Sequence, residues 1–82
     1  MIELYIWNSC PFCQKVLTAV KEMGLEENVD YTIIDGAPGT PGRAAVEKIG
    51  GKAMVPFLVD GTTSMYESDD IIAYLRQVAK TK

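Results

Sequence analysis

Apolar and polar positions in the first half of the chain follow a pattern that predicts a strand, a helix and a second strand. Residues 3–7 alternate roughly and are rich in aromatic and branched side chains, as is typical of a strand. Pro11 suits the first position of a helix, and apolar residues then recur at helical spacing, so we expect a helix over residues 11–23. A further apolar run predicts a strand over residues 28–34.

The second half predicts a short helix, a hairpin and a last helix. After a loop rich in glycine and proline, Thr40 is a suitable cap for a helix that runs from Pro41 to a glycine pair. Residues 55–67 predict two strands joined by a tight Asp-Gly turn. Ser68 is expected to cap a final helix that carries its apolar residues on one side.

This order of elements predicts an α/β fold with a mixed four-stranded sheet and three helices on both faces. A strand, a helix and a strand in succession favour parallel pairing through a right-handed crossover, whereas the later hairpin must be antiparallel. A chain of 82 residues buries only one modest core. We therefore expect a single domain over residues 1–82.

Charge and composition narrow the range of partners. The chain has 8 basic and 11 acidic residues, which are scattered rather than clustered, and its net charge is −3. It therefore lacks the cluster of basic residues that is typical of nucleic-acid binding. The first residues do not resemble a secretory signal, and no apolar run approaches the length that spans a bilayer. We expect a cytoplasmic monomer that does not bind membranes.

The two cysteines are the strongest chemical signal in the sequence. Cys10 stands at the start of the predicted helix, where unpaired backbone N–H groups and the helix dipole favour a thiolate, so it is the expected nucleophile. Cys13 lies one turn further in, within disulfide range, and is expected to resolve a mixed disulfide. Lys15 either adds positive charge nearby or points to solvent.

Less reactive interpretations of this pair stay open. A structural disulfide across so few residues would contribute little stability, and the cytoplasm keeps thiols reduced. Two buried, inert cysteines are a second alternative. A structural zinc site needs about four ligands, whereas the chain has two cysteines and no histidine. No metal is expected.

Three separated motifs make the sequence resemble the glutaredoxins, within the thioredoxin-like fold. Cys-Pro-Phe-Cys at 10–13 is close to the family's Cys-Pro-Tyr-Cys, and Met-Val-Pro at 54–56 stands where the family has Thr-Val-Pro. Glu-Ser-Asp-Asp at 67–70 occupies the family's glutathione-binding turn. The Val-Pro and Glu-Ser elements are also similar to the N-terminal domain of glutathione transferases.

The resemblance implies a cis peptide bond before Pro56 and a glutathione site that faces Cys10. Val55 would present its backbone to the cysteinyl part of glutathione. The helix start at Ser68 would receive the γ-glutamyl carboxylate, while an acidic neighbour would meet the ammonium group. The residues implied to bind glutathione are Phe12, Lys52, Met54, Val55, Pro56, Glu67, Ser68 and Asp69.

The chain departs from the family at one charged position. Trp7 stands three residues before the first cysteine, where glutaredoxins commonly carry a lysine that attracts the glycyl carboxylate. Lys52, ahead of the Val-Pro element, is expected to replace part of that charge or else to be a solvated loop residue.

The resemblance and the cysteine pair together predict a dithiol glutaredoxin that uses glutathione as co-substrate. Its expected partners are proteins that carry disulfides or glutathione mixed disulfides. The alternatives are a redoxin reduced by a flavoprotein reductase, which Trp7 motivates, and a non-enzymatic iron–sulfur carrier that shares Cys10 and glutathione between two chains. For a glutathione transferase fragment of this length we expect slow or absent conjugation, because so short a chain has no second side to a pocket that could bind a hydrophobic electrophile.

Overall fold

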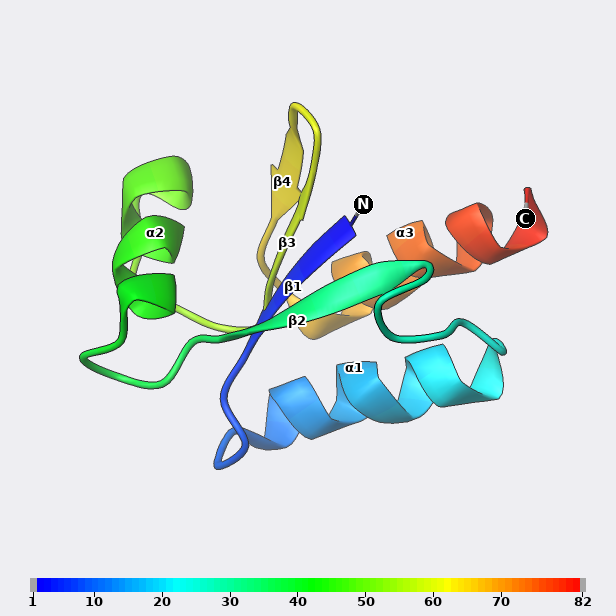
Figure 1. The fold of residues 1–82 in the computed structure, drawn as a ribbon, viewed down its shortest axis with the longest axis horizontal. Helices are drawn as coiled ribbons and strands as arrows, with labels where there is room; N and C mark the ends of the chain where they lie inside the picture. Colours follow the sequence, from blue (N-terminus) through cyan, green and yellow to red (C-terminus); the bar gives the residue numbers. More distant parts are fainter. Residues whose placement is uncertain (1, 82) are drawn as a thin grey trace.

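A computed structural model describes residues 2–81 and contains the seven elements in the predicted order (Figure 1). The strands are β1 (Ile2–Ile6), β2 (Tyr31–Asp35), β3 (Phe57–Asp60) and β4 (Thr63–Met65). The helices are α1 (Pro11–Glu22), α2 (Pro41–Gly50) and α3 (Ser68–Lys80).

The strands form one mixed sheet in the order β2-β1-β3-β4, which confirms the prediction of a four-stranded mixed sheet. β1 pairs in parallel with β2 and antiparallel with β3, and β3 pairs antiparallel with β4. Because the chain leaves β1 and enters β3 at the same end of the sheet, the segment after β1 and the segment before β3 meet there. These two segments carry the cysteines and Pro56.

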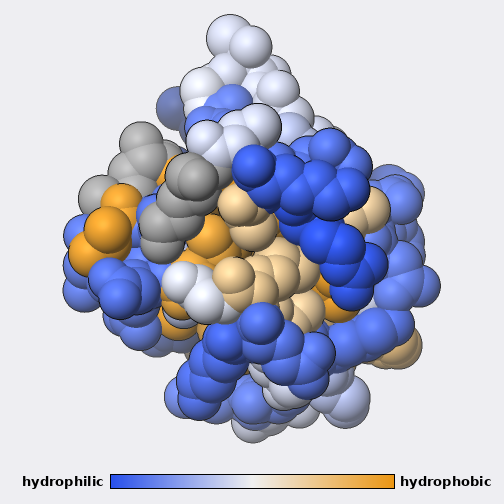
Figure 2. All heavy atoms as spheres, turned by 90° about the vertical axis from the view of Figure 1, so that its right-hand side faces the viewer, coloured by the Kyte–Doolittle hydropathy of each residue, from blue (hydrophilic) through white to orange (hydrophobic). Residues whose placement is uncertain are grey.

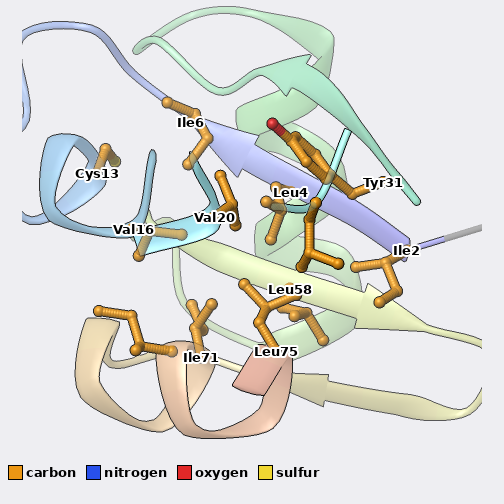
Figure 3. Packing of buried hydrophobic residues seen from close by; sticks show 12 residues of the cluster. Ile2, Leu4, Ile6, Cys13, Val16, Val20, Tyr31, Leu58, Ile71 and Leu75 are labelled. Atoms are coloured by element: carbon orange, nitrogen blue, oxygen red, sulfur yellow. The ribbon is translucent and has the colours of Figure 1, made fainter. Parts of the chain in front are cut away.

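The helices cover both faces of the sheet, as predicted. α1 and α3 lie side by side on one face, and α2 covers the other (Figure 1). The larger core fills the space between the sheet, α1 and α3, where Val16, Leu58 and Ile71 are fully buried and point toward one another (Figure 3). A smaller core beneath α2 consists of Tyr5, Val46 and Phe57.

Besides shifts of one or two residues at several element ends, the starts of β2 and α3 differ from the sequence prediction. β2 starts only at Tyr31, because the residues before it form turns: Asn28 has a positive φ of 65°, and the Asp30 carboxylate accepts a hydrogen bond of 2.8 Å from the Glu26 amide. At the start of α3 the cap position belongs to Glu67, with a φ of 52°, and no side chain caps the helix. The prediction that Ser68 is the cap is therefore wrong, since Ser68 is the first helical residue.

The capping prediction for α2 is confirmed, because the Thr40 hydroxyl accepts a hydrogen bond of 3.3 Å from the Arg43 amide. Within residues 2–81, each helix is too short or too polar to cross a bilayer. At the end of the molecule where α1 and α3 finish, a small apolar area is surrounded by hydrophilic residues (Figure 2).

Candidate active site

Cys10 lies at the start of α1, in the segment that leaves β1. Its backbone is extended, with φ of −94° and ψ of 117°, and Pro11 opens the helix behind it. The side chain is half-buried, and its thiol points to the carbonyl oxygen of Val55 at 3.8 Å. The free N–H groups of the first helical turn therefore lie next to a sulfur that solvent reaches.

Cys13 lies one turn further along α1 and is fully buried within the larger core. Burial raises the pKa of the Cys13 thiol to about 12, and the neighbouring Cys10 adds to the increase. A backbone hydrogen bond to Trp7 and the positive charge of Arg43 oppose this increase in pKa. Cys13 is consequently a protonated thiol at neutral pH, and both cysteines are free in the structure.

The loop before β3 forms the opposite side of the site. The peptide bond between Val55 and Pro56 is cis, and Pro56 is buried beneath the loop. Because the carbonyl of Val55 contacts the Cys10 thiol, this loop lies directly across from the start of α1.

One hollow, which we call the α3 hollow, extends from this loop to the first turn of α3. Its volume is about 210 Å³, and all residues implied to bind glutathione line it except Lys52. Lys15 and Tyr66 complete its wall. Ser68 is only 7% exposed and borders the hollow at the helix start, where free backbone N–H groups suit a carboxylate.

A second hollow, the thiol hollow, surrounds Cys10 and has a volume of about 310 Å³. Met54 and Val55 line both hollows, so the two form one surface that passes the Cys10 sulfur. The side chains of Phe12 and Met54 are 63% and 49% exposed beside it. The remaining lining residues of the thiol hollow are Trp7, Ser9, Pro11, Arg43 and Ala53.

Arg43 supplies a cation to the thiol hollow that the sequence analysis missed. Its guanidinium donates hydrogen bonds to the carbonyls of Gly36 (2.7 Å) and Ala53 (3.0 Å) and lies 5.8 Å from the centre of the Trp7 ring. The predicted Thr40 cap places Arg43 in the first turn of α2, but no local pattern shows that this turn faces the thiol hollow. The positive charge thus lies over the residue that replaces the family lysine.

Lys52 does not fulfil the expectation that its side chain joins the site. The side chain is exposed and lines neither hollow, whereas its backbone amide and carbonyl both bond to the Tyr66 hydroxyl, at 2.9 and 2.7 Å. Tyr66 was also missed by the sequence analysis, although it directly precedes the Glu-Ser-Asp-Asp motif.

Lys15 points across the α3 hollow rather than simply to solvent. Its ammonium forms an ion pair with Asp69, which joins the second turn of α1 to the first turn of α3 at the rim. The side chains are 52% and 81% exposed, so the pair contributes little to stability and can exchange partners. Among residues 2–81, no group of three or more His, Cys, Asp or Glu side chains is placed to hold a metal ion.

Comparison with known proteins gives a consistent family assignment. Residues 4–82 match the model of the glutathione S-transferase N-terminal domain. A probable glutaredoxin from Synechocystis sp. is 33% identical over 72 residues, which cover 88% of this chain and 78% of the relative.

Solved structures share the fold. Human glutathione-S-transferase T1-1 in its apo form superposes with a TM-score of 0.79 at 22% identity, over 98% of this chain and 33% of the transferase. A glutathione transferase homologue from Sulfitobacter, solved with bound glutathione, gives a TM-score of 0.75 at 21% identity, over 99% of this chain and 38% of that protein. The chain therefore spans little more than a third of these relatives and has the thioredoxin-like fold of their N-terminal domain.

Proposed function

This chain belongs to the glutathione S-transferase N-terminal domain family, and on that basis we propose that it is a dithiol glutaredoxin that reduces disulfides with electrons from glutathione. The observation that carries the proposal is the contrast between its two thiols. Cys10 is accessible at a helix start, and Cys13 is sealed and protonated one turn behind it. Neither a structural disulfide nor a pair of inert cysteines requires this difference.

In the first step, the Cys10 thiolate attacks the glutathione sulfur of a glutathionylated client. A bond forms between Cys10 and glutathione, the bond between glutathione and the client breaks, and the client leaves as a thiolate that takes up a proton. The start of α1 stabilises the Cys10 thiolate before the attack.

The mixed disulfide on Cys10 can be resolved in two ways. A second glutathione attacks the bound glutathione sulfur, which releases glutathione disulfide and restores the Cys10 thiolate. Alternatively, Cys13 loses its proton and attacks the Cys10 sulfur, which releases glutathione and leaves a disulfide between the two cysteines. The raised pKa of Cys13 makes the first route the faster one at neutral pH.

The two joined hollows suit glutathione in an extended conformation. Its γ-glutamyl carboxylate would lie at the start of α3 beside Ser68, with its ammonium near Asp69 in place of Lys15. Its cysteinyl part would pass Val55, which borders both hollows. Its glycyl carboxylate would lie in the thiol hollow, where Arg43 provides the charge that Trp7 lacks.

Trp7 in place of the family lysine does not require a flavoprotein reductase as electron donor, because Arg43 supplies a cation to the same hollow. We also propose that the protein is cytoplasmic, because glutathione keeps thiols reduced in the cytoplasm and would be available there as the co-substrate.

The test is reduction of a glutathionylated peptide with glutathione as the only electron donor. Cys10→Ser should abolish turnover, whereas Cys13→Ser should retain the route that uses a second glutathione. Wild-type protein that turns over only with a flavoprotein reductase would contradict the proposed donor. Full activity of Cys10→Ser would contradict the assigned roles of the thiols.

A further inference from the structure

We propose that Tyr66 is a positioning residue that holds the backbone of the loop before Pro56 in the form that binds glutathione. This inference rests on the proposed function and adds to it. Tyr66 lines the α3 hollow but is not part of the motifs that suggested the site.

The Tyr66 hydroxyl both accepts a hydrogen bond from one loop residue and donates one to it. It accepts a hydrogen bond from the Lys52 amide (2.9 Å) and donates one to the Lys52 carbonyl (2.7 Å), while the Val46 carbonyl is more distant at 3.5 Å. A tyrosine hydroxyl has one proton, so the nearer carbonyl receives it. Lys52 is thereby held in place through its backbone at both ends.

The contact continues from Lys52 to the residue that faces Cys10. The Lys52 carbonyl also accepts a hydrogen bond from the Met54 amide (3.0 Å), which closes a turn directly before Val55. The Val55 carbonyl in turn lies 3.8 Å from the Cys10 sulfur. Residues 51–54 are exposed, and besides Tyr66 this segment is held by the hydrogen bonds from the Gly51 amide to the Glu47 carbonyl (2.8 Å) and from Arg43 to the Ala53 carbonyl.

The Tyr66 ring is anchored where its hydroxyl can reach the loop. It packs against Phe57 with ring centroids 4.6 Å apart, and Phe57 is fully buried directly after Pro56. The ring therefore has a fixed base in the smaller core, and the hydroxyl projects toward Lys52.

A glycine at the end of α2 leaves the space that the hydroxyl occupies. A Cβ atom on Gly50 would lie 2.2 Å from the Tyr66 hydroxyl oxygen, far inside van der Waals contact. Gly50 is the last residue of α2 and has no positive φ, so backbone conformation does not require glycine here. Alanine would favour the helix more, so we infer that glycine is needed for the contact with Tyr66.

The experiment compares Tyr66→Phe with wild type in the reduction of a glutathionylated peptide by glutathione. Phenylalanine keeps the ring on Phe57 and removes only the hydroxyl. We expect the KM for the glutathionylated peptide to rise roughly 3- to 10-fold, as for the loss of a hydrogen bond, with a much smaller change in kcat. The rate at which iodoacetamide alkylates Cys10 should change little, because the start of α1, which stabilises the thiolate, is untouched.

Tyr74→Phe is the matched control. It removes a hydroxyl that bonds to Asp60, a residue that lines neither hollow, and should leave KM unchanged. Gly50→Ala provides a second, independent variant, and by displacing the hydroxyl it should raise KM in the same way.

Active wild-type protein with an unchanged KM in Tyr66→Phe and Gly50→Ala would overturn the role of Tyr66 alone. Inactive wild-type protein would overturn the proposed function, and the role of Tyr66 with it.

Discussion

One helical turn separates Cys10 from Cys13, yet the two sulfurs have different surroundings. Cys10 lies where the helix begins and solvent enters, whereas Cys13 faces the apolar side of α1 together with Val16 and Val20. The loss of solvation is the largest cause of the raised pKa of Cys13. The same burial that raises this pKa also makes Cys13 part of the larger core.

This difference predicts how stability depends on pH. The folded protein holds the Cys13 proton up to a pKa of about 12, whereas the unfolded chain releases it near 9.0. Between these values the folded state binds more protons, so the free energy of unfolding should fall as the pH rises through this range. Below it the stabilisation is fully present.

Urea unfolding at pH values between ~8 and ~10.5 tests this expectation against Cys13→Val. The pKa values of Tyr5, Tyr31 and Tyr74 are also raised, so both proteins should lose stability. The wild type should lose more. An equal loss in the two proteins would show that Cys13 does not hold its proton through burial.

At the residue scale, the sequence was sufficient for features that are set within a few residues along the chain. The different exposure of Cys10 and Cys13 follows from their places at the start of one helix. Arg43 and Tyr66 could not be found in this way, because their hydrogen bonds reach residues ten and fourteen positions away. Those contacts exist only after α2 has packed against the sheet.

At the scale of the elements, α2 approaches the end of β2 closely at Gly42. A Cβ atom there would lie 2.0 Å from the carbonyl oxygen of Asp35, which is backbone and cannot rotate away. Gly42 thus sets the distance between helix and strand. The position of Arg43, the next residue, depends on the same approach.

Gly42→Ala should therefore destabilise the fold by roughly 1–3 kcal/mol through overpacking, although alanine alone favours a helix. Urea unfolding measures the change. Ala44→Gly, at an exposed position of the same helix, is the control and should cost about 1 kcal/mol through helix propensity alone. A more stable Gly42→Ala protein would mean that α2 can move away from Asp35 at no cost.

The order, type and pairing of the elements were predictable, because each has a clear period and a clear end signal. The errors arose where a local signal had two solutions. Asn28 and Asp30 fit the polar positions of an alternating strand pattern, but both residue types also favour turns, and in the structure they form turns. A serine before two aspartates is a good cap, yet the positive φ of Glu67 starts the helix one residue earlier. No local pattern predicts that φ in a residue other than glycine.

On the scale of the whole molecule, the net charge of −3 opposes an anionic ligand such as glutathione, which has two carboxylates and one ammonium. The proposed binding of glutathione must therefore depend on local cations. Arg43 lines the thiol hollow, and Lys15 lines the α3 hollow but is already paired with Asp69.

Arg43→Gln should raise the KM for glutathione roughly 3- to 10-fold, between the effects typical of exposed ion pairs and of hydrogen bonds to charged groups. Lys48→Gln changes the net charge equally but lies on the last turn of α2, outside both hollows, and should have little effect. The difference should shrink with added salt. Equal effects of both variants would indicate that the overall field, and not Arg43, controls binding.

The closed position of Cys13 also has a practical use. A maleimide dye added to the native protein should attach only to Cys10, since the other thiol has no exposed surface. No cysteine would need to be removed by mutagenesis beforehand. A fluorophore attached there would sit between the two hollows and could report directly on what enters them.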